Sequence, residues 1–229
     1  MLKKVVLISG GAAVGKTAVL KNIIPLLQSK DLALSVCKIG CVATRDGSVY
    51  QNMGIPHVVG ISGDICPDHF LVSNLPELYH WADEKQSDVL LIETAGLCHR
   101  CSPATEQMAA GCVLDCTSSC HAPAQLGPML TYADFVVLTK IDMVSQAERE
   151  IILWKIKELN PTAKLFTVDG LTGYGAEGLA DWLSCFSKET NFDDDVLRHS
   201  MPSGVCSYCV GEKRVGSAYQ QGVVGKIEF

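Results

Sequence analysis

The sequence lacks a long apolar run, an excess of basic residues and an internal repeat. None of its apolar stretches approaches the roughly 20 residues that a membrane span needs. The formal net charge is −6, so electrostatics give no case for binding nucleic acid or an anionic membrane. For this chain of 229 residues, these absences predict that it binds neither nucleic acid nor a membrane.

The sequence also has no signal-peptide cleavage site. Residues 1–6 are basic and then apolar, as in a signal peptide, but they run directly into a glycine-rich loop. We therefore expect a first strand at this point and a cytoplasmic location.

Cysteine, by contrast, is abundant, with 11 residues. A reducing compartment disfavours disulfides, so this number points to metal or redox work. The alternative is that the cysteines are small buried apolar side chains. That alternative suits Cys185, in an apolar helix expected at 179–186, better than it suits the clustered cysteines.

The stretch Gly10–Thr17 matches the phosphate-binding motif G-x-x-x-x-G-K-[ST]. An apolar, β-branched run precedes it at 5–8, and a helical pattern follows from Ala18, which is the context that the motif requires. Lys16 would reach the β- and γ-phosphates, and the Thr17 hydroxyl would hold Mg²⁺. The predicted phosphate contacts are Gly10, Gly11, Ala12, Ala13, Val14, Gly15, Lys16, Thr17 and Ala18.

A second motif follows the apolar run at 88–92, which delivers Glu93 and, three residues later, Gly96. A carboxylate at the end of a buried strand can reach Mg²⁺ or its waters, and the Gly96 N–H can sense the γ-phosphate. Hydrolysis would be phosphoryl transfer to water, with Lys16 and Glu93 as catalytic residues. Asp46 and Asp64 are candidates to position the water, and either could supply a carboxylate near Mg²⁺, with Asp46 assigned to the ion. Either carboxylate could equally be a solvated loop charge.

The base is predicted from Lys140-x-Asp142, after an apolar run at 135–138. The Asp142 carboxylate can accept from guanine N1–H and its amino group together, and the lysine stem can cover the ring. Thr139 stands where the usual motif has asparagine, so ATP stays the alternative to GTP. Asp169, which opens the loop before the last predicted helix, is also assigned to the nucleotide.

The order of the elements predicts the fold. Apolar strand patterns at 32–39, 56–61 and 164–168 alternate with helical patterns at 70–85, 148–159 and 179–188. This order predicts an α/β fold, a doubly wound and mainly parallel sheet flanked by helices, with ligands at the carboxyl ends of the strands. We expect a nucleotide-binding domain at 1–190 with a cysteine-rich insert at 98–121. A small tail at 191–229, with a Cys-x-x-Cys pair and a hairpin-like pattern, would follow.

The clustered cysteines predict a metal or cluster site. Cys98 and Cys101 have chelate spacing, and Cys112, Cys116 and Cys120 at intervals of four would share one face of a helix. Such thiolates could bind zinc, nickel or copper, or hold an iron–sulfur cluster, and buried thiols without metal are the alternative. The candidate ligands are Cys41, Cys66, Cys98, Cys101, Cys112, Cys116, Cys120, Cys206 and Cys209.

Taken together the motifs resemble the metallochaperone GTPases of urease and hydrogenase maturation, UreG and HypB, with the CobW proteins as cousins. The matching pieces span about residues 1 to 186: Gly10–Thr17, Thr44–Asp46, Ser62–Asp68, Glu93–Gly96, Lys140–Asp142 and Leu171–Leu183. The resemblance implies Mg²⁺-dependent GTP hydrolysis that is slow without a partner. It also implies nucleotide- or metal-dependent dimerisation and delivery of a transition metal, often nickel, to an apo-metalloenzyme or its maturation complex.

The sequence departs from that family at several points. The metal motif Cys-Pro-His of the urease-type proteins reads Cys66-Pro67-Asp68, with His69 one place later. Cys41 lies near the position of a family aspartate thought to approach Mg²⁺, and a thiol is a poor Mg²⁺ ligand. The cysteine-rich insert and the tail pair are also absent from the urease-type pattern.

Three functions remain open from the sequence. The first is a GTPase that loads a metal or metallocofactor into a target enzyme. The second is an iron–sulfur ATPase or GTPase that acts as a redox activator or cluster carrier, and the third is a non-hydrolysing storage or regulatory module. Because the Cys98 stretch continues directly from Gly96, we expect nucleotide state to change metal affinity.

Overall fold

The computed structural model describes residues 2–42, 47–97, 99–188, 194–200, 212–219 and 224–229. Of the predicted site residues, Asp46, Cys98, Cys206 and Cys209 lie outside these ranges, as do Thr44 and Arg45.

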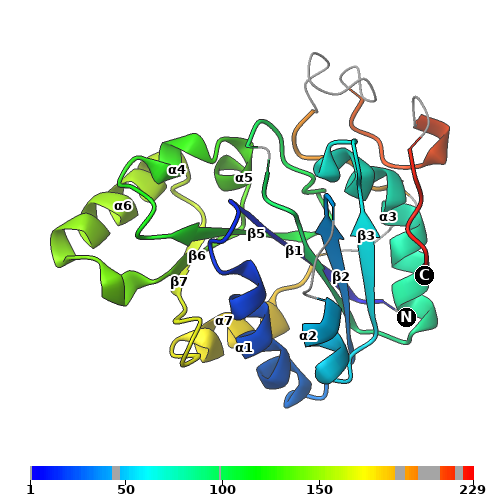
Figure 1. Cartoon of the computed structure of the whole chain (residues 1–229), viewed down its shortest axis with the longest axis horizontal. Coiled ribbons are helices and arrows are strands. Elements are labelled where there is room, and N and C mark those ends of the chain that lie inside the picture. Colours follow the sequence, from blue (N-terminus) through cyan, green and yellow to red (C-terminus); the bar gives the residue numbers. More distant parts are fainter. Residues whose placement is uncertain (1, 43–46, 98, 189–193, 201–211, 220–223) are drawn as a thin grey trace.

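The described chain forms a sheet of seven parallel strands in the order β3-β2-β4-β1-β5-β6-β7 (Figure 1). The strands are β1 Lys4–Gly10, β2 Leu34–Gly40, β3 His57–Ile61, β4 Val89–Glu93, β5 Ala109–Asp115, β6 Phe135–Thr139 and β7 Lys164–Thr167. Every pair of neighbours runs in the same direction, so the prediction of a doubly wound parallel sheet is confirmed. The carboxyl ends of β1, β2 and β4 therefore meet at one edge.

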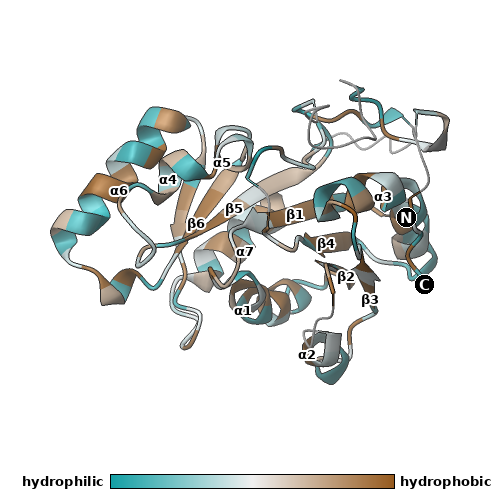
Figure 2. Ribbon diagram, turned by 45° about the horizontal axis from the view of Figure 1, so that its top comes forward, coloured by the Kyte–Doolittle hydropathy of each residue, from teal (hydrophilic) through white to brown (hydrophobic). Residues whose placement is uncertain are grey.

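Helices cover both faces of this sheet (Figure 2). On one face Val6 and Ile8 of β1 pack with α1 and α7, and on the other Val5 and Leu7 pack with α3, because successive strand side chains point to opposite faces. The first face carries α1 Lys16–Gln28, α2 Gly47–Asn52 and α7 Ala176–Cys185. The second carries α3 Pro67–Glu84, α4 Ala122–Gln125, α5 Pro128–Thr131 and α6 Gln146–Leu159.

The prediction that Cys112, Cys116 and Cys120 share a helical face is wrong. Cys112 lies in β5, between β1 and β6, and Cys116 follows the last residue of that strand. All seven residues of β5 are buried, so the strand shows no polar alternation that would mark it in the sequence. Position 111 of this strand requires glycine, because an added Cβ would lie 2.3 Å from the Phe135 ring. The expected insert is thus a loop, a central strand and a second loop.

The described part of the tail packs on the domain through Arg198. Its guanidinium donates to the carbonyl oxygens of Thr105, Met108 and Tyr132 and forms an ion pair of 2.7 Å with Asp134. Antiparallel bridges join Thr105 to Leu197 and Val196 to Arg214. These contacts tie residues 196–198 to the loop that follows Cys101.

Two further anchors hold the tail on α3. The Tyr79 hydroxyl donates to Asp195, a carboxylate that is 1% exposed, at 2.8 Å. The last residues run along α3 (Figure 1), where the Asn74 side chain donates to the Gly225 carbonyl and accepts from the Ile227 N–H. The C-terminal residues therefore cover part of the α3 core.

Among the residues that the structure describes, no helix is long and apolar enough to span a bilayer.

Candidate nucleotide site and neighbouring thiol pair

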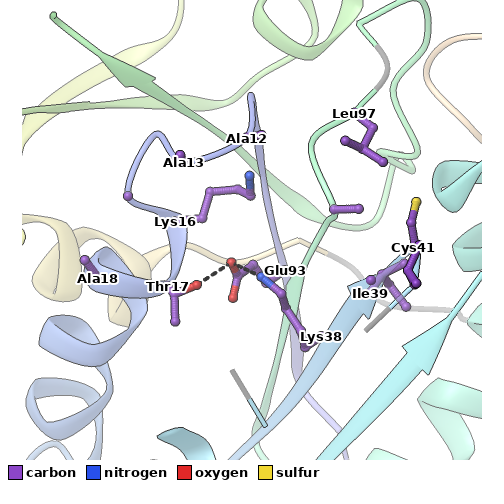
Figure 3. Close-up of a pocket in the computed structure, with 14 residues that line it drawn as sticks. Ala12, Ala13, Lys16, Thr17, Ala18, Lys38, Ile39, Cys41, Glu93 and Leu97 are labelled. Atoms are coloured by element: carbon purple, nitrogen blue, oxygen red, sulfur yellow. Dashed lines mark hydrogen bonds and ion pairs between the residues drawn. The ribbon is translucent and has the colours of Figure 1, made fainter. Parts of the chain in front are cut away.

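A cavity of about 570 Å³ lies at the carboxyl ends of β1, β2 and β4 (Figure 3). The phosphate-binding loop and the start of α1 form one side, and the ends of β2 and β4 form the other. It is lined by Ala12, Ala13, Gly15, Lys16, Thr17, Ala18, Lys38, Ile39, Gly40, Cys41, Val42, Glu93, Ala95 and Leu97. The two nucleotide motifs predicted from the sequence thus face one space.

Glycine is required where these two motifs touch. Gly96 has a φ of +75°, and an added Cβ would lie 2.3 Å from the Gly10 carbonyl oxygen and 2.6 Å from Lys16 Nζ. Gly10 has a φ of +134°, and its Cβ would lie 2.3 Å from the Val113 carbonyl oxygen of β5. The segment after β4 therefore rests directly on the phosphate loop, without room for a side chain between them.

The side chain of Lys16, the first residue of α1, folds back over the phosphate-binding loop. Its side chain is buried, and Nζ donates to the carbonyl oxygens of Gly10 at 3.0 Å and Gly11 at 2.6 Å. The loop leads into the N-terminus of α1, whose N–H groups and dipole favour an anion. A cation and a helix N-terminus at one point are the chemistry that a phosphate group requires.

Glu93 is the centre of the polar contacts in this cavity. Its Oε1 accepts from the Thr17 hydroxyl at 2.7 Å and from Lys38 Nζ, and its Oε2 accepts from the Tyr50 hydroxyl at 2.7 Å. The structure thus brings together Thr17 and Glu93, the two described residues that the sequence assigned to Mg²⁺. A hydroxyl and a carboxylate on adjacent sides of a phosphate site are oxygen donors that fit this ion.

Sequence reasoning missed Lys38 and Tyr50. Lys38 lies opposite Glu93 in the register of β2 with β4 and is 7% exposed. The available signal was a charged residue inside the apolar run Leu34–Ile39, because a strand buried on both faces rarely carries one. Tyr50, on α2, carried no comparable signal.

Thr139, which stands where the usual motif has asparagine, supports the phosphate loop. Its hydroxyl is buried and donates to the carbonyl oxygen of Val14 in the phosphate loop at 2.7 Å. Lys140 forms an ion pair of 2.5 Å with Asp115, at the end of β5. The end of β6 is therefore tied both to the phosphate loop and to the neighbouring strand.

A second cavity of about 480 Å³ brings Asp142 and Asp169 to one space. It is lined by Ile141, Asp142, Arg149, Thr167, Asp169, Thr172 and Tyr174. The Asp169 carboxylate accepts from the Thr172 hydroxyl and the Leu171 N–H, and the Thr172 hydrogen bond is the main cause of its lowered pKa. Asp169 thus shapes its own loop beside the position expected for the base.

Of two other predicted residues, Cys41 lies at the first cavity and Asp64 lies away from it. Cys41 lines the first cavity (Figure 3), and its sulfur accepts from the Ser62 hydroxyl at 3.5 Å. Asp64, a candidate to position water, is exposed in the loop after β3 and does not line the cavity.

Cys66 and Cys101 come together beside the nucleotide motifs. Cys66 precedes α3, and Cys101 lies five residues after Gly96. A hydrogen bond from Cys101, with help from the His69 and Asp68 N–H groups, lowers the pKa of the Cys66 thiol to about 6. Cys101 Sγ also lies 3.6 Å from Asp68 Oδ2, and burial raises the pKa of that carboxyl to about 7.

His69 and the remaining thiols differ from this pair. Burial lowers the pKa of His69 to about 4 and raises the pKa of Cys112 to about 12 and of Cys116 to about 11. Cys112 and Cys116 pack in the apolar core under α4, α5 and α6, whereas Cys101 packs in the core under α3. Cys120 is half-buried in the loop after β5.

A complete metal site is not formed by the described residues alone. Within them, no three side chains of His, Cys, Asp or Glu converge closely enough to hold a metal ion. The structure therefore places two thiols side by side, and further ligands would have to come from elsewhere.

Comparison with known proteins identifies the family. Residues 4–167 match the model of the CobW/HypB/UreG nucleotide-binding domain. An uncharacterised protein of Methanocaldococcus jannaschii, MJ0120, is 43% identical over 98% of this chain and 96% of its own length. The urease accessory protein UreG of Yersinia pestis is 26% identical over 86% of this chain and 92% of its own length.

Solved structures agree on the fold. HypB from Helicobacter pylori, in complex with nickel, superposes with a TM-score of 0.63 at 19% identity, covering 82% of this chain and 92% of that one. HypB from Archaeoglobus fulgidus gives 0.61 at 22% identity, with 79% and 89% covered. These likenesses show the fold. The family model, which spans residues 4–167, confirms the resemblance expected from the motifs: the chain belongs to the CobW/HypB/UreG family of metallochaperone GTPases.

Proposed function

We propose that this chain is a GTP-binding and GTP-hydrolysing metallochaperone that holds a transition metal through Cys66 and Cys101 and delivers it to a metalloenzyme. The observation that carries the proposal is the position of this thiol pair. Cys101 follows Gly96 by five residues, and Gly96 rests on the phosphate loop. A change at the γ-phosphate would therefore move one of the two sulfurs relative to the other.

The phosphate end of the site performs the hydrolysis. The loop N–H groups and Lys16 bind the β- and γ-phosphates, and Thr17 and Glu93 would hold Mg²⁺, which neutralises the charge on those phosphates. The attacking water needs a group to orient it. Asp46, outside the described residues, remains our candidate, because Asp64 is exposed away from the cavity.

Guanine is favoured over adenine by the two carboxylates in the second cavity. Asp142 can accept both N–H groups on one edge of guanine, and adenine offers no such pair. Lys140 precedes Ile141, which lines this cavity, and its Nζ forms an ion pair of 2.5 Å with Asp115 Oδ2. The hydroxyl of Thr139 ties the base side to the phosphate loop, so the absent asparagine amide does not remove that connection.

The metal is a transition metal, with nickel or zinc as the first candidates. A thiol whose pKa is lowered to about 6 is largely thiolate at neutral pH, the form that binds such metals. Two sulfurs do not complete a tetrahedral site. Further ligands would come from Cys98, from the tail pair Cys206 and Cys209, or from the same residues of a second copy in a homodimer.

Buried packing leaves Cys112 and Cys116 out of this proposal. Their pKa values of about 12 and 11 keep them protonated at neutral pH. They lie under a different group of helices from Cys101.

Metal affinity in the two nucleotide states tests this function. Protein purified without oxygen is loaded with GDP or a non-hydrolysable GTP analogue, each with Mg²⁺, and titrated with Ni²⁺ or Zn²⁺ by calorimetry. We expect the affinities to differ by about tenfold or more between the two states, in line with typical coupling energies. We also expect Cys66→Ser and Cys101→Ser to abolish the difference. Cys185→Ser, at an exposed and distant thiol, is the matched control and should keep it.

Equal metal affinities in both states would remove the coupling from the proposal. A brown protein that absorbs near ~400 nm and contains sulfide would instead favour the iron–sulfur alternative. Absence of nucleotide turnover even with the client enzyme present would favour a storage module.

A further inference from the structure

We propose that Lys38 is a second phosphate-binding lysine of the nucleotide site, which transfers from Glu93 to the terminal phosphates when Glu93 binds Mg²⁺. The inference rests on nucleotide binding at this cavity and adds a residue that the motifs do not contain. Lys16 and Lys38 are the two lysines among the described residues that line the cavity.

The Lys38 ammonium lies next to the Mg²⁺-binding end of the phosphate loop. It shares the oxygen Glu93 Oε1 with the Thr17 hydroxyl, which donates at 2.7 Å. Thr17 ends the phosphate-binding motif and lies in the first turn of α1. Figure 3 shows Thr17 and Lys38 reaching Glu93 from opposite sides. The ammonium is therefore separated from the Mg²⁺- and phosphate-binding end of the loop by a single carboxylate oxygen.

The ion pair between Lys38 and Glu93 is buried, and burying it costs solvation energy. Lys38 and Glu93 have side-chain exposures of 9% and 1%. Burying two charges costs about as much solvation as their attraction returns, and apolar residues of similar size stabilise a fold at least as well. The other β2 side chains on this face, Leu34 and Val36, are apolar and buried. A buried ion pair in an apolar strand is thus better explained by function than by stability.

Binding of Mg²⁺ and nucleotide would change the ion pair between Lys38 and Glu93. Glu93 cannot give Oε1 fully to both the ammonium and a divalent cation, because the two positive charges repel each other at that distance. The lysine side chain carries a compact charge on a flexible four-carbon stem, so its ammonium can move from Glu93 to a nearby anion. The β- and γ-phosphates, bound to the adjacent loop, are the anion that this cavity brings into reach.

The test compares variants in a background without the buried carboxylate. Glu93→Gln and the double variant Glu93→Gln/Lys38→Met are titrated with a fluorescent non-hydrolysable GTP analogue in EDTA. Neither variant leaves a buried carboxylate unpaired, and the double variant has no charge at either position. We expect the double variant to bind the analogue about tenfold more weakly than Glu93→Gln, as loss of one ion–phosphate contact would give. Affinities within about twofold of each other would overturn the proposal.

Two controls distinguish phosphate binding from a merely structural role. Lys85→Met removes a positive charge from an exposed position at the end of α3, which does not line the cavity, so it should bind the analogue within about twofold of the wild type. Lys38→Arg keeps the charge and should retain most of the affinity that Lys38→Met loses in the presence of Mg²⁺. If Lys38→Arg binds as weakly as Lys38→Met, charge is not the reason and the proposal fails. Wild-type protein that binds no nucleotide at all would instead refute the proposed function.

Discussion

The phosphate end of the molecule and its cysteine-rich stretch are built in different ways. At the phosphate end, Gly96 lies against the backbone of Gly10, and Lys16 Nζ donates to the Gly10 carbonyl oxygen; the motif spacing alone predicts this arrangement. In the cysteine-rich stretch, Cys101 finds its partner Cys66 thirty-five positions earlier, while Cys112 is part of a central strand. Local spacing therefore predicts a site made of backbone, but it does not predict which sulfur side chains meet.

The largest expected effect separates the two kinds of thiol. Because the pKa of Cys66 is lowered to about 6, its alkylation by iodoacetamide should rise as pH increases through about 6 and then level off near pH 7 to 8. Cys112, with a pKa of about 12 and no exposure, should react at least about 100-fold more slowly at pH 7. Mass spectrometry of the labelled peptides between pH 5 and 8 measures both rates. Similar alkylation rates for Cys66 and Cys112 would contradict the difference in pKa between the two thiols.

The second effect tests the contact between the two nucleotide motifs. Gly96→Ala places a Cβ against the Gly10 carbonyl oxygen and Lys16 Nζ at a positive φ, so we expect nucleotide affinity to fall by about 100-fold or more. Gly54→Ala is the matched control, since its φ is +67° but an added Cβ meets nothing within 4 Å. It should cost about 1 kcal/mol of stability and leave nucleotide affinity unchanged. A Gly96→Ala protein that binds normally would mean that the two motifs move independently.

The smallest effect concerns Thr139, where a side chain rather than a backbone contact supports the phosphate loop. Thr139→Val keeps the shape but leaves the Val14 carbonyl oxygen without its 2.7 Å hydrogen bond. We expect a loss of about 1–2 kcal/mol in the free energy of unfolding, measured in urea, because a buried acceptor loses its partner. Thr131→Val, at an exposed position, should change stability by less than about 0.5 kcal/mol. Equal losses in both variants would show that the hydroxyl does not stabilise the loop.

The sequence predicted the parts of the fold and site that depend on local pattern. The strand patterns at 5–8, 88–92 and 135–138 correspond to β1, β4 and β6, because apolar β-branched runs bounded by motifs are distinctive. The strand β5 was missed, since its small residues and Cys112 matched the spacing of metal ligands as well as that of a buried strand. The Thr17 hydroxyl donates to Glu93, so the two motifs meet in space, and the role of both residues at Mg²⁺ stays a prediction.

Other features of the site depend on contacts that spacing does not contain. The pairing of Cys66 with Cys101 requires the start of α3 and the loop after β4 to meet in space. The exposure of Asp64 and the hydrogen bond from Thr139 to Val14 likewise arise from packing between distant segments. Lys38 was visible in the sequence, but only its register opposite Glu93 gives it meaning.

Arg198 has a practical consequence for anyone who shortens this protein. One guanidinium gathers carbonyl oxygens from Thr105, Met108 and Tyr132 and the carboxylate of Asp134. A version cut at residue 190 would leave those four acceptors facing solvent at the foot of β5 and β6. Domain boundaries chosen from motif matches alone would therefore remove Arg198 and its contacts, so any shortened version should keep residues 194–200.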